Sequence, residues 1–372
     1  MSQIKVLHVC PAFFPMRGGI EVLVETAIGE LKAHHSIESE VLTPRHRGER
    51  PDIAVVNGSM VHSIDLFPFV PPEEFARSFA VLFAQVRKVI STSQPDVIHI
   101  HGFSPLALAA SSVAHTLNRP VIAHVHGELE PGLPPHYFSL LGQAHSVLAV
   151  STPVANSIRE LTDVAVDKIS IIPNGVATPT RDRRNSSDPV VVLVGRLEPE
   201  KGFSDAMEAM AEIIQSIPEA KLRVIGAGLE LYDLQLQADR LGIAKSVSFL
   251  GELSHDDVLR NIAEAMVVVV PSRSIEGFSL VAAEAASMGV PVVATRVGGL
   301  SETVRDGRTG VLVAPHSPRE IAAAVLALAR NPATREKMSQ TAMAEAAQRF
   351  SLDRFVSELA THYRSAVARA SH

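Results

Sequence analysis

Residues 271–291 read PSRSIEGFSLVAAEAASMGVP and follow a valine-rich apolar run that ends at Val270. A run this short and this rich in β-branched residues predicts a strand buried on both faces of a sheet. The Ala-rich part predicts a helix over 279–288, because Gly289 and Pro291 come after it in the order typical of helix ends. The loop between the strand and the helix then opens at the carboxyl end of the strand.

Two carboxylates and a helix start make this stretch a candidate binding site. Glu276 stands in the loop, and Glu284 follows within the helix. Backbone amides at a helix N-terminus attract a diphosphate, and here they belong to Gly277, Phe278, Ser279 and Leu280. Either Glu taken alone is equally compatible with a structural role, as a partner of the helix dipole or as a solvated side chain.

The segment EGFSLVAAE resembles the E-x7-E signature of the retaining glycosyltransferases of family 4. The resemblance implies the GT-B fold, an α/β fold of two Rossmann-like domains with parallel sheets facing across a cleft. It also implies that Glu276 contacts hydroxyls of the donor sugar and that Glu284 holds the nucleotide ribose. Family members commonly carry glycine where this chain has Ser279, whose hydroxyl is expected beside the phosphate.

Length and composition bound the class of protein. The chain has 372 residues, 46% of them hydrophobic and 20% charged, which predicts a globular protein of two domains. The net charge of −6 argues against a nucleic-acid partner. One cysteine excludes an internal disulfide, residues 1–20 do not read as a signal peptide, and no apolar run has the length of a membrane span. We therefore expect a cytoplasmic protein, with at most peripheral contact at the inner face of the cell membrane.

The first half of the chain alternates strands with helices. Strands are predicted at 4–9, 39–42, within 55–64 around a turn at Asn57-Gly58, and at 96–101, 120–126, 144–150 and 168–172. Helices are predicted after Gly19, after Pro72 and after Ser151. The helix after Pro72 is amphipathic with few basic residues, which favours packing on the core over binding to a membrane surface.

The loop before the first helix carries adjacent glycines, Gly18 and Gly19. Glycine lets a phosphate approach the backbone, but a glycine pair alone is equally typical of a tight turn. The pattern P-x-x-G-G-x-E, from Pro15 to Glu21, is similar to the N-terminal loop of family 4. This resemblance implies that the glycine amides approach the distal phosphate of the donor.

Two predicted strands end in His-x-His followed by glycine. His99 and His101 share one face of their strand, and so do His124 and His126, because side chains alternate along a strand. A metal site completed by nearby acidic residues is one interpretation. We favour a second, in which two spatially separate strands present ligand-contacting residues at the carboxyl edge of a sheet, without a metal.

The resemblance extends to the residues around these strands. His126 matches the active-site histidine of family 4, which lies near the donor sugar. His101, Glu128 and Asn174 are assigned to the acceptor side. The family usually reads P-N-G-V-D where this chain reads P-N-G-V-A, so Ala177 offers no polar group there.

Residues 177–188 are polar, charged and without periodicity, which predicts a linker. The predicted domains are an acceptor domain over 1–176 and a nucleotide-sugar donor domain over 189–351. In GT-B proteins the terminal helix crosses back to the first domain, and the resemblance implies this for 352–372. The second domain is expected to contain strands at 189–194, 221–225, 247–250, 266–270, 292–295 and 310–313.

The loop GRLEPEKG, residues 195–202, carries two cations. Arg196 offers a fork of donors to a phosphate, and Lys201 offers a point charge. Two cations at the carboxyl end of a strand favour an anion site over solvated charges. G-R-L-x-x-x-K-G is also a hallmark of family 4, which implies that both residues hold the diphosphate.

Gly226-Ala-Gly228 looks like part of a dinucleotide fingerprint, but the third glycine is missing. We interpret this segment as a loop over the nucleotide. By the resemblance, the strand that ends at Leu250 contacts the base through its backbone.

The resemblance implies retaining transfer of a hexose-type sugar from a nucleoside diphosphate sugar to a saccharide, a lipid-linked saccharide or a small metabolite. UDP is favoured over GDP only because it is the more frequent carrier in the family. A metal-independent front-face mechanism is expected, without a cofactor, in which cations stabilise the leaving diphosphate. Glu276 would bind hydroxyls rather than attack the sugar, while His126 orients it. The alternatives are an enzyme like UDP-N-acetylglucosamine 2-epimerase, also of GT-B fold, and a non-catalytic sugar-nucleotide-binding protein. The incomplete glycine pattern weighs against a nicotinamide oxidoreductase.

Overall fold

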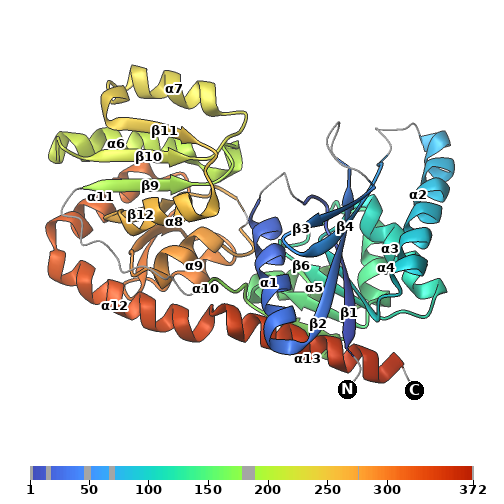
Figure 1. Cartoon of the computed structure of the whole chain (residues 1–372). Helices are drawn as coiled ribbons and strands as arrows, with labels where there is room; N and C mark the ends of the chain where they lie inside the picture. The colour runs from blue at the N-terminus through green and yellow to red at the C-terminus, as the bar shows by residue number, and fades with distance from the viewer. Residues whose placement is uncertain are drawn as a thin grey trace. The chain divides into compact units, whose positions relative to one another are not determined.

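A computed structural model of the chain describes residues 3–13, 18–45, 52–66, 72–177, 189–274 and 276–370, without the side chains of 72–76. The chain splits into two compact units, Met1–Gly175 with Leu352–His372 (unit 1) and Val176–Ser351 (unit 2) (Figure 1). Pro15, Ile275 and the predicted linker beyond Ala177 lie outside the described residues.

Unit 1 is built on an eight-stranded sheet in the order β3-β4-β2-β1-β5-β6-β7-β8. The strands are β1 (Ile4–Val9), β2 (Ile37–Pro44), β3 (Ile53–Val56), β4 (Ser59–Ile64), β5 (Val97–His101), β6 (Val121–Val125), β7 (Ser146–Ala149) and β8 (Ile169–Ile171). Neighbouring strands are parallel except β3 and β4, which form a hairpin. The predicted turn is confirmed, because Asn57 (φ 49°) and Gly58 (φ 80°) adopt the left-handed backbone of a two-residue hairpin turn.

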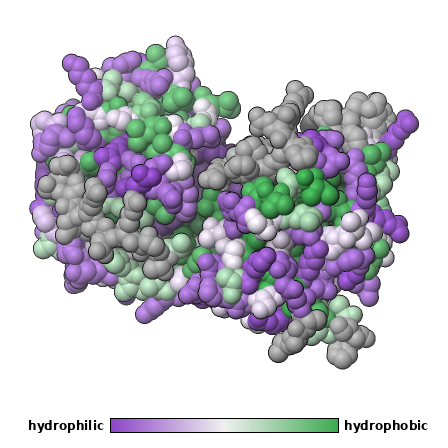
Figure 2. All heavy atoms as spheres, viewed as in Figure 1, coloured by the Kyte–Doolittle hydropathy of each residue, from purple (hydrophilic) through white to green (hydrophobic). Residues whose placement is uncertain are grey.

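The hairpin lies at the edge of this sheet and exposes apolar side chains. Ile53, Val55 and Met60 are 53%, 73% and 40% exposed. Figure 2 shows hydrophobic residues gathered over this hairpin.

The helices of unit 1 are α1 (Gly19–His35), α2 (Pro72–Ser93), α3 (Pro105–Thr116), α4 (Pro135–Gln143), α5 (Thr152–Leu161) and α13 (Leu352–Ala370). The predicted helices after Gly19, Pro72 and Ser151 are confirmed, whereas α3 and α4 were not predicted. Helix α2 packs against α3 and buries Leu82, Val86 and Ile90, as expected for a core-packed helix. No helix in the described ranges is long and apolar enough to cross a membrane.

The last helix of the chain belongs to the first unit. Helix α13 contacts α1, β1 and β5 (Figure 1). Its Phe355 and Tyr363 are buried. Arg354 Nη2 donates to the carbonyl of Pro173 at 2.5 Å. A Cβ at Gly175 would lie 2.7 Å from Cβ of Phe355, so glycine is needed where the loop after β8 meets this helix.

Unit 2 is built on a six-stranded sheet, parallel throughout, in the order β11-β10-β9-β12-β13-β14. Its strands are β9 (Val190–Val194), β10 (Lys221–Ile225), β11 (Val247–Gly251), β12 (Val267–Val270), β13 (Val292–Thr295) and β14 (Gly310–Val313). Its α-helices are α6 (Phe203–Ser216), α7 (Leu231–Arg240), α8 (His255–Ala263), α9 (Leu280–Ser287), α10 (Leu300–Thr303), α11 (Pro318–Arg330) and α12 (Pro332–Arg349). The six predicted strands and the helix at 279–288 are confirmed to within a few residues, whereas α7 was not predicted.

Helices on both faces explain the valine-rich strands of unit 2. Along β12, Val267 and Val269 enter one core cluster, and Val268 and Val270 enter the other. Successive side chains of a strand point to opposite faces, so a strand covered on both faces is apolar at every position.

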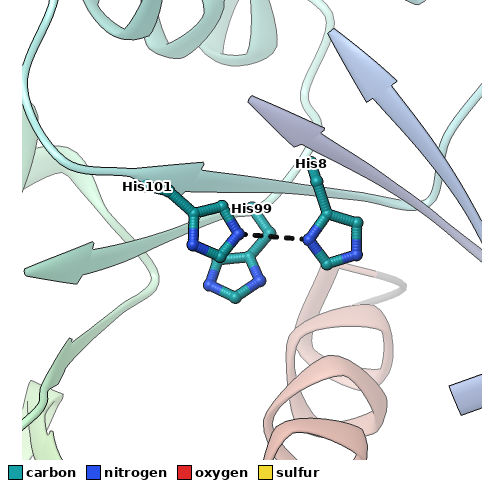
Figure 3. Close-up of side chains that lie close together, drawn as sticks. All are labelled: His8, His99 and His101. Atoms are coloured by element: carbon teal, nitrogen blue, oxygen red, sulfur yellow. Dashed lines mark hydrogen bonds between the residues drawn. The ribbon is translucent and has the colours of Figure 1, made fainter. Parts of the chain in front are cut away.

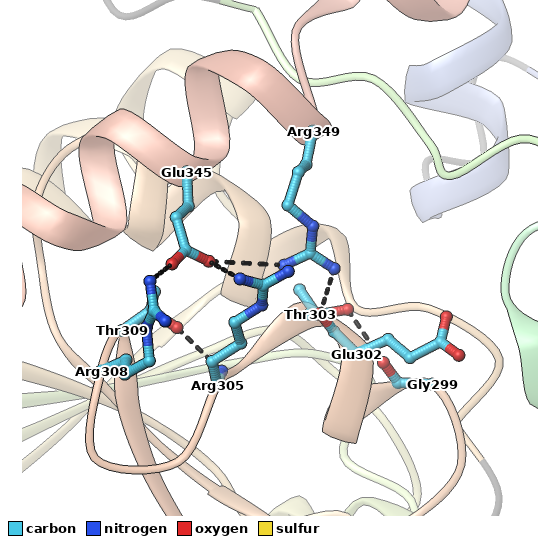
Figure 4. A network of polar contacts seen from close by, with 8 residues as sticks. All are labelled: Gly299, Glu302, Thr303, Arg305, Arg308, Thr309, Glu345 and Arg349. Carbon is cyan, nitrogen blue, oxygen red and sulfur yellow. Dashed lines mark hydrogen bonds and ion pairs between the residues drawn. The ribbon is translucent and has the colours of Figure 1, made fainter.

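A charged network ties α12 to the segment between α10 and β14 (Figure 4). The carboxylate of Glu345 pairs with Arg305 at 3.2 Å, with Arg308 at 2.8 Å and with Arg349 at 3.8 Å. Arg349 also donates to the carbonyl of Glu302 at 2.6 Å. Because Glu345 is the shared acceptor, the network depends on one carboxylate.

Candidate active site

The loops that follow the adjacent strands β9 and β12 bring a cation and a carboxylate together. Lys201 ends a 3₁₀ turn (Pro199–Lys201), and its Nζ donates to Oε2 of Glu276 at 2.8 Å. The hydroxyl of Ser272 donates to the same oxygen at 2.9 Å. The side chains of Lys201 and Glu276 are only 26% and 15% exposed, respectively. The structure thus joins two residues that the sequence assigned to the donor site separately.

Close backbone contact between these loops fixes the pair. A Cβ at Gly202 (φ 68°) would lie 2.1 Å from the carbonyl oxygen of Pro271. The amide of Arg273 donates to the carbonyl of Glu200 at 2.8 Å. Gly202, the last residue of the GRL…KG loop, must therefore be glycine, because any side chain there would clash with the backbone of Pro271.

Arg273 is a further cation at this place that sequence reasoning missed. Its guanidinium binds both carboxylate oxygens of Asp205, at 2.8 and 2.5 Å. Arg196, the predicted phosphate-binding residue, is held less firmly, because its side chain is 69% exposed and pairs with Glu200 at 3.5 Å. Leu250, on the edge strand β11, is 37% exposed.

The start of α9 has a cap from its own side chain. Ser279 is buried, and its hydroxyl accepts from the amide of Ala282 at 3.3 Å. Before it, Phe278 packs edge-on against Phe350, with ring centroids 5.4 Å apart. The hydroxyl of Ser279 thus caps the helix, where the sequence suggested contact with a phosphate. At this helix start Gly277 is buried and Leu280 is partly exposed.

Glu284 is buried rather than solvated. The residue is 8% exposed, and Oε1 accepts from Nε2 of His255 at 2.8 Å. His255 begins α8, and no sequence pattern linked it to Glu284. Both carboxylates of the E-x7-E signature are therefore oriented by a hydrogen-bond partner, Glu276 by Lys201 and Glu284 by His255.

The glycines of Gly226-Ala-Gly228 are explained by the neighbouring loop. A Cβ at Gly226 would lie 1.9 Å from the carbonyl oxygen of Gly195, and one at Gly228 would lie 2.4 Å from that of Leu197. The amide of Leu197 donates to the carbonyl of Ala227 at 2.8 Å. This segment therefore supports the loop that carries Arg196 and Lys201.

In unit 1, the glycine pair begins α1. Gly18 is the N-cap, and its amide donates to Oε2 of Glu21 at 2.9 Å. Gly19 is the first residue of the helix. The carboxylate of Glu21 thus satisfies the amide that the sequence assigned to the distal phosphate.

Strands β5 and β6 are direct neighbours, so the expectation of spatially separate strands is wrong. Register places His101 opposite His124, and it also places His8 of β1 opposite His99. Because aligned residues of parallel strands face the same side, these four imidazoles share one face of the sheet. His8, His99 and His101 are shown in Figure 3. Sequence reasoning missed His8, which follows no His-x-His pattern.

Hydrogen bonds link these rings. Nδ1 of His8 lies 3.2 Å from Nε2 of His101, and Nδ1 of His101 lies 3.2 Å from Nε2 of His126 (Figure 3 shows the first contact). Nδ1 of His99 lies 2.6 Å from the hydroxyl of Tyr363 on α13. His101 is 3% exposed and has both ring nitrogens engaged, so it offers no free nitrogen to an acceptor.

Burial keeps the histidines neutral. It lowers the pKa of His8 to about 3 and that of His126 to about 4. Burial and the neighbouring imidazoles lower the pKa of His99, His101 and His124 well below its usual value. Neutral imidazole is also the form that binds a metal.

Among the described residues, two histidine groups have ring nitrogens close enough together to hold a metal ion, His8 with His99 and His101, and His101 with His124 and His126.

The acceptor-side candidates Glu128 and Asn174 also belong to unit 1, but to neither of these histidine groups. Glu128 is half-buried, and burial together with Glu160 raises the pKa of its carboxyl. Asn174 is 5% exposed.

Comparisons with known proteins place this fold and sequence. HepE of Anabaena, in a complex with UDP and glucose, superposes with a TM-score of 0.81 at 22% identity, over 97% of this chain and 100% of that one. Sucrose-phosphate synthase of Thermosynechococcus elongatus gives 0.84 at 21% identity, over 98% and 100%. The chain therefore has the predicted GT-B fold.

Two family models match in succession, Glycosyltransferase Family 4 over 17–179 and Glycosyl transferases group 1 over 178–345. The D-inositol 3-phosphate glycosyltransferase of Acidothermus cellulolyticus is 31% identical over 94% of this chain and 86% of that protein. Glycogen synthase of Mycobacterium tuberculosis is 32% identical over 67% of this chain, and the match spans 64% of that enzyme, less than two thirds of its length. The chain belongs to glycosyltransferase family 4.

Proposed function

We propose that this protein transfers a hexose-type sugar, with retention of configuration, from a nucleoside diphosphate sugar to a saccharide, a lipid-linked saccharide or a small metabolite. UDP is favoured over GDP as the carrier. Family membership supports the reaction class, and HepE, of the same fold, binds UDP and glucose. A GDP-mannose-dependent mannosyltransferase of Mycolicibacterium smegmatis, 30% identical over 85% of its length, keeps GDP as the second candidate.

The contact that carries this proposal is the pair Lys201–Glu276 at 2.8 Å. A cation at the carboxyl end of a parallel sheet stabilises a departing diphosphate, and Arg196 and the start of α9 add to this in the proposal. Glu276 already accepts from two donors, Lys201 and Ser272, which orients it for binding sugar hydroxyls.

The remaining roles in the proposal are those implied by the resemblance to family 4. Glu284, oriented by His255, binds the ribose, and His126 contacts the transferred sugar. Glu128 and Asn174 of unit 1 contact the acceptor. In a front-face reaction the leaving phosphate oxygen takes the acceptor proton as the new glycosidic bond forms, so neither a nucleophilic carboxylate nor a metal is needed.

Differential scanning fluorimetry with UDP, GDP, ADP and NAD tests the donor site. We expect one nucleoside diphosphate to raise the melting temperature, because a ligand that binds only the folded state stabilises it. The rise should vanish in Glu284→Ala and persist in Glu212→Ala, which removes an exposed carboxylate from α6. Stabilisation by NAD alone, or by none of the four at millimolar concentration, would contradict the proposal.

Product analysis separates the transferase from its main alternative. With the donor that binds and a panel of saccharide acceptors, NMR should show a product whose anomeric configuration equals that of the donor, formed equally well in EDTA. A 2-epimerase-like enzyme would instead change the donor sugar without glycosylating any acceptor.

A further inference from the structure

A continuous chain of polar contacts crosses the sheet of unit 1 beneath α13. It begins at Ser39 on β2, whose Oγ lies 3.3 Å from Nε2 of His8 on β1. It continues through His101 on β5 to His126, just beyond β6, by the two nitrogen–nitrogen contacts of 3.2 Å. Each internal ring thus uses both of its nitrogens.

The rings meet head-on. Ring centroids of His8 and His101 lie 5.5 Å apart with planes inclined by 19°, and those of His101 and His126 lie 5.4 Å apart at 20°. These separations exceed the 3.2 Å nitrogen–nitrogen distances by nearly the sum of the two ring radii, which is the largest excess possible, so each nitrogen points along the line of centres at its partner. This is the geometry of an N–H···N hydrogen bond.

The same geometry disfavours a metal ion. Ring nitrogens bind Zn²⁺ at about 2.0–2.1 Å with their lone pairs converging on the ion, so two nitrogens that face each other at 3.2 Å leave no room between them. The rings of His124 and His126 are stacked, with centroids 4.3 Å apart. Lone pairs lie in the ring planes, so stacked rings do not direct them at a common point.

Hydrogen bonding couples the proton positions along the chain. A neutral imidazole has one N–H and one bare nitrogen, so two arrangements satisfy every contact. In the first, all three rings carry the proton on Nε2 and donate toward Ser39. In the second, the hydroxyl of Ser39 donates, all three rings carry the proton on Nδ1, and the last proton sits on Nδ1 of His126.

The last ring nitrogen in this row of hydrogen bonds, Nδ1 of His126, decides between the two proton arrangements. Nδ1 of His126 is buried and has no hydrogen-bond partner in the described part of the chain. Buried N–H groups without a partner are rarer in proteins than unsatisfied acceptors, which favours the arrangement that leaves this nitrogen bare. We propose that His8 and His101 are positioning residues that hold His126 in its Nε2–H tautomer and leave Nδ1 as a hydrogen-bond acceptor for a substrate hydroxyl. The substrate contact rests on the proposed function, whereas the tautomer does not.

Imidazole nitrogen-15 NMR of histidine-labelled protein tests the tautomer directly. His126, assigned by loss of its signals in His126→Asn, should carry its proton on Nε2. His101→Phe replaces the imidazole with an aromatic ring that has no nitrogens, so both hydrogen bonds of His101 are lost. His126 should then become a mixture of tautomers. His99→Phe is the matched control, because His99 lies on the same strand and face but bonds Tyr363 instead.

A milder pair of variants covers the case in which His101→Phe does not fold. Ser39→Ala removes the acceptor at the far end and should raise the Nδ1–H fraction of His126. Ser63→Ala, which removes a buried hydroxyl that is not part of the Ser39–His8–His101–His126 contacts, should leave the Nδ1–H fraction of His126 unchanged. If donor binding is established, His101→Phe should raise the KM for the donor about tenfold and leave kcat less affected, the effect of one lost hydrogen bond.

Three results would overturn the proposal. One is His126 protonated on Nδ1 in the wild-type protein, and another is an unchanged tautomer in both His101→Phe and Ser39→Ala. The third is Zn²⁺ bound stoichiometrically to the purified protein and lost in His101→Phe, which would make the cluster a metal site. A protein that shows the predicted tautomers but binds no nucleotide would contradict only the proposed function.

Discussion

Buried imidazoles make the stability of this protein depend on pH. His8, His99, His101 and His124 are 1%, 0%, 3% and 1% exposed, and burial without a counter-charge disfavours their protonated form. In the unfolded chain each is a solvated histidine that takes up a proton near its ordinary pKa of 6.5. Folding therefore requires these residues to stay neutral.

We predict that the protein loses stability in mild acid. Between the unfolded pKa of 6.5 and the folded pKa of about 4 for His126 and about 3 for His8, the unfolded chain binds more protons than the folded one. The free energy of unfolding therefore falls as pH falls through this window, by up to about 1.4 kcal/mol per pH unit for each histidine.

His124→Leu should reduce that slope, because it removes a histidine whose pKa is lowered by burial. The substitution breaks no hydrogen bond, since neither ring nitrogen of His124 has a partner in the described ranges. Urea unfolding at pH 7.5, 6.0 and 5.0 measures the slope. His115→Leu, at an exposed position on α3, serves as the control and should leave it unchanged. An equal slope in the wild type and in His124→Leu would show that His124 is not a group that must remain neutral.

At the scale of elements, the loops that follow β9 and β10 support each other. The amide of Gly195 donates to the carbonyl of Ile225 at 3.0 Å, and that of Glu230 donates to the carbonyl of Leu197 at 2.9 Å. Gly226 lies in this contact with a left-handed backbone, φ 130°. The contact holds the backbone of the loop that carries Arg196 and Lys201.

Gly226→Ala should therefore destabilise unit 2 through a clash as well as backbone strain. The new Cβ would meet the carbonyl of Gly195 at 1.9 Å. We expect a loss of about 3 kcal/mol or more, against about 1 kcal/mol for Gly242→Ala. Gly242 also has a positive φ, 70°, but a Cβ there would meet nothing within 4 Å. Chemical denaturation of the two variants would compare the losses, and equal values would exclude the clash.

In the whole molecule, one structural unit is built from two separate segments of the chain and the other from a single segment. Unit 1 is completed by residues from both ends of the chain, whereas unit 2 is continuous from Val176 to Ser351. The two large core clusters of unit 2 draw only on residues between Val190 and Met338. Unit 2 therefore has its own core, and unit 1 depends on α13.

Ending the chain after Ser351 should selectively destabilise unit 1. The truncation removes the buried Phe355 and Tyr363, and it leaves His99 without its hydroxyl partner. Limited proteolysis should then degrade unit 1 and leave a resistant fragment that contains 189–351. A chain ended after Ala370 should keep both units resistant. Protection of both units in the shorter chain would mean that α13 is dispensable for folding.

Local sequence predicted most elements because their signals are local. Valine runs gave the strands of unit 2, and glycine, proline and hydroxyl caps gave the ends of helices such as α5 and α9. Helix α3 was missed although Ser104 caps it, since most of its residues are buried and no polar face breaks the apolar pattern. Helix α4 is short and begins after proline, so its pattern was too brief to stand out.

Sequence patterns alone predicted the alternating α/β architecture, the family, and the residue types at the candidate donor site, because periodicity and short motifs lie within a few turns of chain. The folded structure was needed to show that β5 pairs with β6, that Lys201 meets Glu276, that Glu284 meets His255, and that His8 is hydrogen-bonded to His101. These partners are 29 to 93 positions apart where they form hydrogen bonds. Such contacts follow from strand order and register, which the packing of a whole unit sets and no local pattern encodes.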